Sequence, residues 1–247
     1  MRRLGLIGGM SWESTTEYYR LINRGIAARL GGLHSADLLL HSVDFAPVAA
    51  LQQSGDWQGA GVVLADAARG LERAGARAIV LCTNTMHHVS ASIEAAVRIP
   101  LLHIVDTTGR ALAQAGIRRA GLLGTRYTME LPFWRQRLQD GFGIGLVVPD
   151  DADRTVVHDV IYQELCLGRI EPRSREAYAH IIARLADAGA EAVVLGCTEI
   201  TLLVRSEDTK LPVFDTTALH ADAAVEFALA DDGQATETPR RGEEKFH

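Results

Sequence analysis

The sequence predicts an α/β fold with two similar, doubly wound parallel-sheet domains, related by a pseudo-twofold axis and enclosing a functional cleft between them. Two observations lead to this prediction. Strand-like apolar runs alternate with helical patterns, which is typical of parallel sheets joined by right-handed crossovers. Four short blocks then recur in the same order in the second half of the chain, which indicates a duplicated α/β unit.

The first unit begins with an apolar strand at 3–7 that runs into Gly8-Gly9. Ser14 and Glu17 have the spacing of a capping box, which predicts a helix from there to about residue 30. A buried strand is expected at 78–81, where four apolar, partly β-branched residues stand together. The other predicted elements are a strand at 36–43, a helix at 56–74, a helix at 84–97, a strand at 100–105 and a helix capped by Asp106 to Thr108.

The repeat defines the second unit. The matching blocks are 3–8 with 119–124, 74–76 with 188–190, 78–85 with 192–199, and 100–108 with 211–217. They predict a first domain at 1–110 and a second at 111–216. A last helix, at about 217–229, is a candidate to pack on the first domain. Residues 231–247 are polar and contain Gly and Pro, so we expect this tail to be disordered.

Composition excludes several classes of protein. A hydrophobic fraction of 47% and a charged fraction of 23% are ordinary for a globular chain. A net charge of −6 gives no basic surface for nucleic acid. No apolar run approaches the roughly 20 residues that span a bilayer, and the glycines that follow Arg2-Arg3 interrupt any signal-peptide core. We therefore expect a cytoplasmic protein with no nucleic-acid or membrane partner.

Cofactor chemistry also finds little support in the sequence. The three cysteines, Cys82, Cys166 and Cys197, have no zinc-type spacing, so reduced thiols and no metal are expected. A Schiff-base enzyme, including one that uses pyridoxal phosphate, needs a well-placed lysine amine. Only Lys210 and Lys245 occur, and Lys245 lies in the polar tail. The glycines at 5–9 lack the Gly-x-Gly-x-x-Gly spacing of a dinucleotide site, so we predict no cofactor.

The strand ends of the repeat carry the polar groups that chemistry needs. Cys82-Thr83-Asn84-Thr85 follows the strand at 78–81, and Gly196-Cys197-Thr198-Glu199 follows the matching strand. Open α/β sheets bind ligands at the carboxyl ends of their strands. With the two polar clusters aligned, Thr83 lies opposite Cys197 and Cys82 lies opposite Gly196.

Each candidate group has a functional and a structural interpretation. Cys197 at a helix start can be a thiolate of lowered pKa, or a small buried hydrophobe. The Thr83 to Thr85 cluster suits a carboxylate at a helix start, or it simply caps that helix. Cys166 lies among leucines and is expected to be structural. Met10, Ser11 and Gln52 are plausible lining residues, whereas each histidine is expected in the core or on the surface.

Taken together, four motifs resemble the aspartate/glutamate racemase family over residues 3–229. The motifs are Gly8-Gly9-Met10, Asn84-Thr85 with His87, Gly124-Thr125, and Gly196-Cys197-Thr198-Glu199. The resemblance implies a cofactor-independent isomerase, often a homodimer, in which two cysteines flank the α-carbon of a small amino-acid substrate. The substrate-binding residues that it implies are Met10, Gln52, Asn84, Thr85, Thr125, Thr198 and Glu199.

The sequence departs from the family pattern at the first catalytic position. The family usually has Cys-Asn-Thr, and here Thr83 precedes Asn84. Neighbouring side chains on a strand point to opposite faces, so Thr83 rather than Cys82 is assigned to that position, with Cys82 kept as the alternative. The resemblance then implies that Cys197 is the base, that Thr83 is the proton donor, and that L-to-D turnover is favoured kinetically.

Substrate choice stays open on the sequence alone. Some aspartate-specific members of the family carry a lysine near the position of Cys166, and this chain has none there. L-Aspartate or L-glutamate is the leading expectation. The alternatives are a broad-specificity amino-acid racemase, a decarboxylase or cis–trans isomerase of small dicarboxylic acids, and a small-molecule binding protein with two lobes.

Overall fold

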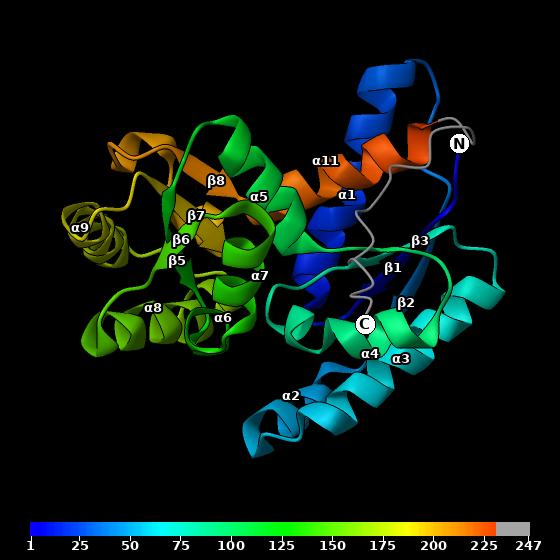
Figure 1. The fold of residues 1–247 in the computed structure, drawn as a ribbon, viewed down its shortest axis with the longest axis horizontal. Helices are drawn as coiled ribbons and strands as arrows, with labels where there is room; N and C mark the ends of the chain where they lie inside the picture. The colour runs from blue at the N-terminus through cyan, green and yellow to red at the C-terminus, as the bar shows by residue number, and fades with distance from the viewer. Residues whose placement is uncertain (231–247) are drawn as a thin grey trace, which may run out of the picture.

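The protein, described here from a computed structural model, is defined over residues 1–230. The tail at 231–247, predicted to be disordered, lies outside the described residues. Two four-stranded parallel sheets organise the rest (Figure 1), which confirms the predicted fold class. No helix among the described residues is long and apolar enough to cross a membrane.

The first half builds one sheet in the order β2-β1-β3-β4. Its elements are β1 (Leu4–Gly8), α1 (Trp12–Leu30), β2 (Leu38–Ser42), α2 (Phe45–Ser54), α3 (Trp57–Arg73), β3 (Ala78–Leu81), the 3-10 helix η1 (Thr85–Val89), α4 (Ser90–Ala96), β4 (Leu101–Leu102) and α5 (Ile104–Gln114).

The second half repeats this design in the order β6-β5-β7-β8. Its elements are β5 (Arg119–Gly124), α6 (Arg126–Glu130), α7 (Phe133–Phe142), β6 (Gly145–Val147), α8 (Asp151–Gln163), the 3-10 helix η2 (Leu165–Leu167), α9 (Pro172–Asp187), β7 (Ala192–Gly196), α10 (Ile200–Leu203), the 3-10 helix η3 (Ser206–Asp208), β8 (Val213–Asp215) and α11 (Thr216–Leu229).

The last helix of each half covers the sheet of the other half. Along α5, Ile104, Val105 and Leu112 pack into a core with β5 and β7. Along α11, Ala224 and Val225 pack into a core with β1 and α1, and Figure 1 shows α11 crossing from the second sheet to lie along α1. Residue 110, where the sequence suggested a domain boundary, therefore falls inside a helix that serves the second sheet.

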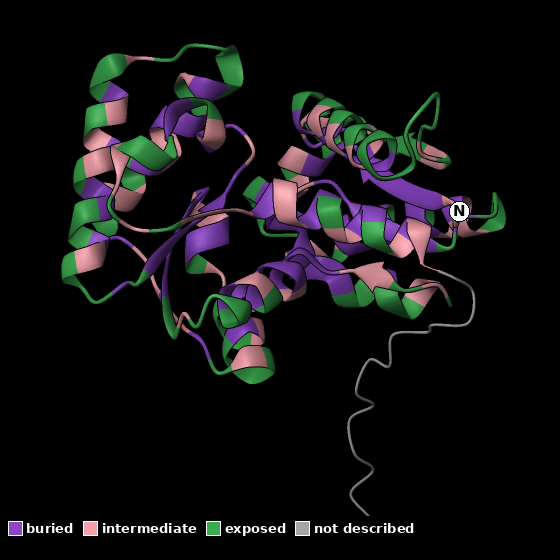
Figure 2. Ribbon diagram, turned by 90° about the horizontal axis from the view of Figure 1, so that it is seen from above, coloured by how far each residue is buried: buried purple, intermediate pink, exposed green. Residues whose placement is uncertain are grey.

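Burial follows the layered arrangement. In Figure 2 the central strands are buried and the outer faces of the surrounding helices are exposed. All five residues of β1 and all five of β7 are buried, as expected for parallel strands that are covered on both faces. This core fixes the strands, and their carboxyl ends in turn position the polar clusters.

Several predicted elements differ from the structure. The helix expected at 84–97 is a 3-10 helix followed by the short α4. The strand expected at 100–105 shrinks to Leu101–Leu102, because α5 already begins at Ile104 with His103 as its N-cap. Asp106 therefore lies inside the helix, where its carboxylate accepts two hydrogen bonds from Arg137 instead of capping the helix start. The helix α2 was not predicted.

Candidate functional site

The carboxyl ends of strands from both sheets meet at one cavity that is partly open to solvent. The structure brings together all the residues that the sequence suggested. The cavity is lined by Met10, Gln52, Thr83, Asn84, Thr85, Thr125, Cys197, Thr198 and Glu199.

The turn after β1 places the residues that follow it at the wall of this cavity. Gly9 has a φ of +95°, and a Cβ atom there would lie 2.2 Å from the carbonyl oxygen of Val43, so only glycine fits. The helix α1 then begins with Ser11 as its N-cap, whose hydroxyl accepts from the Ser14 amide at 3.3 Å. The predicted capping box of Ser14 and Glu17 is wrong, and the Ser14 side chain lines the cavity instead.

A carboxylate joins the start of α1 to the candidate thiol. Cys197 Sγ donates to Glu199 Oε2 at 3.0 Å. The other carboxylate oxygen, Oε1, accepts from Ser11 Oγ at 3.2 Å and from Ser14 Oγ at 3.1 Å. Cys197 and Glu199 are each only 9% exposed. Glu199 is therefore held in place from the first half of the chain while it contacts the thiol of the second.

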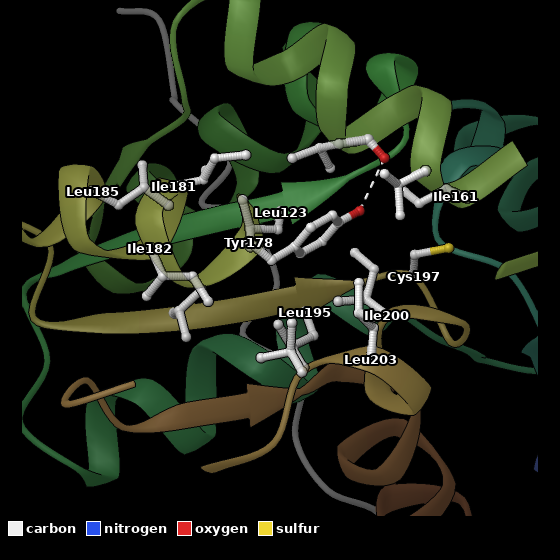
Figure 3. Close-up of a cluster of buried hydrophobic side chains, with 14 of the residues drawn as sticks. Leu123, Ile161, Tyr178, Ile181, Ile182, Leu185, Leu195, Cys197, Ile200 and Leu203 are labelled. Atoms are coloured by element: carbon white, nitrogen blue, oxygen red, sulfur yellow. Dashed lines mark hydrogen bonds between the residues drawn. The ribbon is translucent and has the colours of Figure 1, made fainter. Parts of the chain in front are cut away.

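This arrangement reverses the expected effect on the Cys197 pKa. Burial, and then the charge of Glu199 and its hydrogen bond, raise the pKa of the Cys197 thiol well above its ordinary value. The predicted lowering is wrong, because α10 begins only at Ile200 and has four residues, whereas a carboxylate lies in direct contact. Figure 3 shows Cys197 at the margin of the apolar cluster that surrounds Tyr178. Cys197 is therefore a thiol at neutral pH.

The strand register shows where Thr83 and Cys82 lie. Ile7 pairs with Leu81, and Leu123, its counterpart in the repeat, pairs with Leu195. Thr83 and Cys197 thus each stand two residues beyond equivalent pairs. Thr83 lines the cavity, whereas Cys82 is fully buried behind the sheet with Leu4, Leu6 and Tyr18. Burial raises the pKa of the Cys82 thiol.

Asn84 lines the cavity and has an unpaired acceptor in its side chain. Its Nδ2 donates to Thr216 Oγ1 at 3.0 Å, and that hydroxyl donates to the carbonyl oxygen of Leu195 at 2.8 Å. Because the only proton of the Thr216 hydroxyl is used in this way, the amide of Asn84 must face it with its NH₂ group. The Asn84 Oδ1 atom is left buried and without a partner.

Hydroxyl groups form another part of the wall. The Oγ1 atoms of Thr85, Thr125 and Thr128 share hydrogen bonds of 3.0 to 3.2 Å, and this triangle again joins the two halves. Thr198 Oγ1 lies 3.2 Å from Thr217 Oγ1. Gln52 Nε2 donates to Met86 Sδ at 2.8 Å. The triangle uses all three of its hydroxyl protons. Gln52 keeps a second N–H, and the Thr198 hydroxyl keeps its proton when it accepts from Thr217, so these two groups can donate hydrogen bonds to an anionic ligand such as a carboxylate.

Sequence reasoning missed part of the wall. Ser14 was assigned to a helix cap. Cys166, which was expected to be structural, lies within η2 and lines the cavity. Phe45 belongs to the helix that was not predicted. Ile161, Tyr162 and Gly196 also line the cavity, as does Ser11, which the sequence had suggested. Among the described lining residues, Glu199 is the only one with a formal charge.

Metal-ligand geometry is absent from the part of the chain that the structure describes. No group of three or more His, Cys, Asp or Glu side chains within residues 1–230 is arranged to hold a metal ion. Cys82, Cys166 and Cys197 are all free.

Comparisons with known proteins give a consistent family. The Asp/Glu/hydantoin racemase family matches residues 7–224. A crystal structure of a candidate Asp/Glu racemase from Yersinia pestis is 56% identical, with a TM-score of 0.89, over 93% of this chain and 100% of that one. An aspartate racemase homologue from Pyrococcus horikoshii OT3 is 31% identical, with a TM-score of 0.80, over 92% of this chain and 99% of that one.

A curated relative adds a different substrate range. The chain is 25% identical over 167 residues to the broad specificity amino-acid racemase RacX of Bacillus subtilis (strain 168). The matched region covers 67% of this chain and 70% of that protein.

Proposed function

Because the chain belongs to the Asp/Glu/hydantoin racemase family, we propose that it is a cofactor-independent amino-acid racemase that converts L-aspartate or L-glutamate to the D-enantiomer. The observation that carries the proposal is the pairing of Thr83 and Cys197. Two side chains that can exchange protons come from equivalent strand ends of the two sheets and line one cavity.

Glu199 supplies what the Cys197 thiol lacks. A thiolate is the basic form of cysteine, and burial beside a carboxylate opposes its formation. Glu199 Oε2, 3.0 Å from Sγ, can accept the thiol proton. A substrate ammonium group close to Sγ then favours the thiolate by direct attraction, because Glu199 supplies the only formal charge among the described lining residues and that charge is negative.

The proton transfers balance over one turnover. The Cys197 thiolate removes the α-proton of the L-enantiomer, and the Thr83 hydroxyl delivers a proton to the opposite face of the planar carbanion. The proton from the α-carbon ends on Cys197 Sγ. Thr83 regains a proton from water, and Glu199 releases the proton that it accepted. No electron pair leaves the substrate, so neither a redox partner nor a leaving group is required.

The unpaired Asn84 Oδ1 favours an amino acid over a dicarboxylic acid. A buried acceptor without a partner costs about 1–3 kcal/mol. An α-ammonium group offers three N–H donors to such an atom, whereas a fully ionised dicarboxylate offers none. An α-ammonium group that reached Oδ1 would remove this cost, which supports racemisation over the decarboxylase and cis–trans isomerase alternatives that the sequence left open.

One observation favours a second candidate, a broad-specificity racemase. No Lys, Arg or His stands among the described lining residues, so a distal carboxylate would find hydroxyl and amide donors but no cation. Similarity to the broad-specificity relative agrees with this alternative. Under it, neutral amino acids are turned over faster than aspartate and glutamate.

Solvent isotope incorporation tests the proposal. The purified protein is incubated in deuterated water with L-aspartate, L-glutamate and, for the second candidate, L-methionine. A racemase must place deuterium on the α-carbon and form the D-enantiomer, and Cys197→Ala must do neither. If no substrate gains α-deuterium while ligands still bind, the two-lobed binding protein becomes the better interpretation.

The proposal extends to a homodimer in the cytoplasm. Family resemblance suggested the dimer, and the three free cysteines agree with a reducing compartment. Sedimentation of the purified protein tests the dimer directly, and a concentration-independent monomer would contradict it.

A further inference from the structure

Three buried histidines form a cluster of edge-to-face rings next to the strand end that carries Thr83. The ring centroids of His87 and His103 are 4.6 Å apart, and those of His87 and His220 are 5.6 Å apart. They come from η1, the N-cap of α5 and α11. None of them lines the cavity, so the proposed chemistry does not use them directly.

Hydrogen bonds define the tautomer of His87. The Ile104 amide donates to His87 Nε2 at 3.2 Å, so this nitrogen carries no proton. The proton of the neutral ring is therefore on Nδ1, which donates to the carbonyl oxygen of Thr83 at 2.7 Å. Burial and the neighbouring histidines lower the pKa of His87 well below its ordinary value, so the ring stays neutral at physiological pH.

Two further hydrogen bonds hold the His220 ring in this cluster. His220 Nε2 donates to the carbonyl oxygen of Leu102 at 2.6 Å, and its Nδ1 accepts from the Tyr18 hydroxyl at 2.9 Å. His220 belongs to α11 and Tyr18 to α1. The His87 ring thus contacts groups at the start of α5 and on α11, and Tyr18 of α1 in turn holds His220.

Thr83 depends on its backbone for orientation. Its amide donates to the carbonyl oxygen of Leu81 at 2.9 Å, and its carbonyl oxygen accepts from His87. Within residues 1–230, no hydrogen bond holds the Thr83 hydroxyl itself. The direction of this hydroxyl therefore follows from the backbone conformation of Thr83 together with its restricted χ1 rotamer.

We propose that His87 is a positioning residue, which aims the Thr83 hydroxyl at the substrate by holding the Thr83 carbonyl group. The inference rests on the proposed function, because it assigns His87 to one of the two proton transfers. His87 serves the face of the substrate where Thr83 acts and leaves the Cys197 face unaffected.

Two amide substitutions separate the two bonds of the ring. In His87→Asn the side-chain NH₂ lies near the Nδ1 position and can still donate to Thr83. In His87→Gln the longer amide reaches the Nε2 position and keeps the contact with Ile104 only. Both variants lose the same ring, so a general packing defect affects them alike.

The expected result is a change in the ratio of two rates. Cys197 alone can remove the α-proton of the L-enantiomer, exchange with solvent and return a deuteron to the same face. In His87→Gln, racemisation should fall by about 10- to 100-fold, since small misplacements of catalytic groups cost up to about that factor, while α-deuteration without inversion continues. In His87→Asn the ratio should stay near that of the unmodified protein.

Tyr18→Phe is the control, because it removes the hydrogen bond to His220 in the same histidine cluster and makes no change at Thr83. It should leave the ratio of exchange to racemisation unchanged. An equal loss of both rates in His87→Gln, or no loss of either, overturns the inference. If the unmodified protein neither exchanges nor racemises, the proposed function fails instead.

A measurement on the unmodified protein tests the inference even if the variants do not fold. Nitrogen-15 NMR of labelled histidine distinguishes the two neutral tautomers. The inference requires the proton of His87 on Nδ1, and a proton on Nε2 overturns it whatever the enzymatic activity.

Discussion

Acidification should destabilise this protein through its buried histidines, and the structure gives the size of the effect. Burial lowers the pKa of His220 to about 4 and that of His103 to about 2. Unfolded histidine titrates near 6.5. Between pH 6.5 and the folded pKa, the unfolded chain binds protons that the folded chain does not bind. The stability that depends on these neutral histidines is therefore fully present above pH 6.5, and it is lost as the pH falls below that value.

The magnitude follows from the pH interval. From pH 6.5 to pH 5, each histidine that stays neutral in the fold costs about 2 kcal/mol, at about 1.4 kcal/mol per pH unit. His220 and His103 together should remove about 4 kcal/mol by pH 5. That loss is large beside the ordinary stability of about 5–15 kcal/mol for a folded domain.

Urea unfolding at pH 7.5 and pH 5 measures this loss. His220→Gln removes one titrating ring and keeps an amide that can donate to the Leu102 carbonyl oxygen. The drop between the two pH values should be smaller in this variant by about 2 kcal/mol. His180→Gln, on the exposed side of α9, is the matched control. If His220→Gln loses as much stability as the unmodified protein, the neutral buried state of His220 is refuted.

Further predictions concern the cavity and the turn that leads into it. Cys197→Ala should abolish racemisation, and a bound substrate should protect this thiol from alkylation; full activity of the variant would rule out Cys197 as the base. Thr83→Ala should lose about 10²–10⁴-fold in rate and Cys82→Ala far less, with initial rates from both enantiomers as the measurement; the opposite order would make Cys82 the first catalytic group. Activity should survive dialysis against chelators and carbonyl reagents, and its restoration by pyridoxal phosphate or a divalent metal would contradict the cofactor-free mechanism. Gly9→Ala should lower the urea midpoint, because its Cβ would meet the Val43 carbonyl oxygen at 2.2 Å; an unchanged midpoint would show that the turn relaxes freely.

The sequence predicted the fold class because the repeated blocks include the central strands, and these strands are buried on both faces of their sheets. The strand at 78–81 matches β3 for the same reason. The strand at 100–105 could not be placed correctly, since His103 and not Asp106 caps α5. That choice depends on Arg137, which reaches Asp106 from α7, far along the chain.

The candidate site shows a similar limit. Residues at strand ends were found, because their position follows from the topology of parallel sheets. The role of Ser14 was not, since its spacing to Glu17 suits a capping box whereas its actual acceptor is Glu199 in the other half. The raised pKa of Cys197 was also not predicted. It depends on burial and on the contact with Glu199, whereas the position of Cys197 at a predicted helix start suggests a lowered value.

The crossing of α11 onto the first sheet has a consequence for synthesis on the ribosome. Leu4, Leu6 and Tyr18 need Ala224 and Val225 to complete their core, yet α11 is the last element of the described chain. At typical elongation rates the interval between β4 and the end of α11 lasts on the order of 10 s. During that time the part of this apolar core that α11 covers stays exposed beside the ribosome. Nascent chains stalled before Thr216 should therefore be targets for chaperones, whereas chains extended well past Leu229 should not.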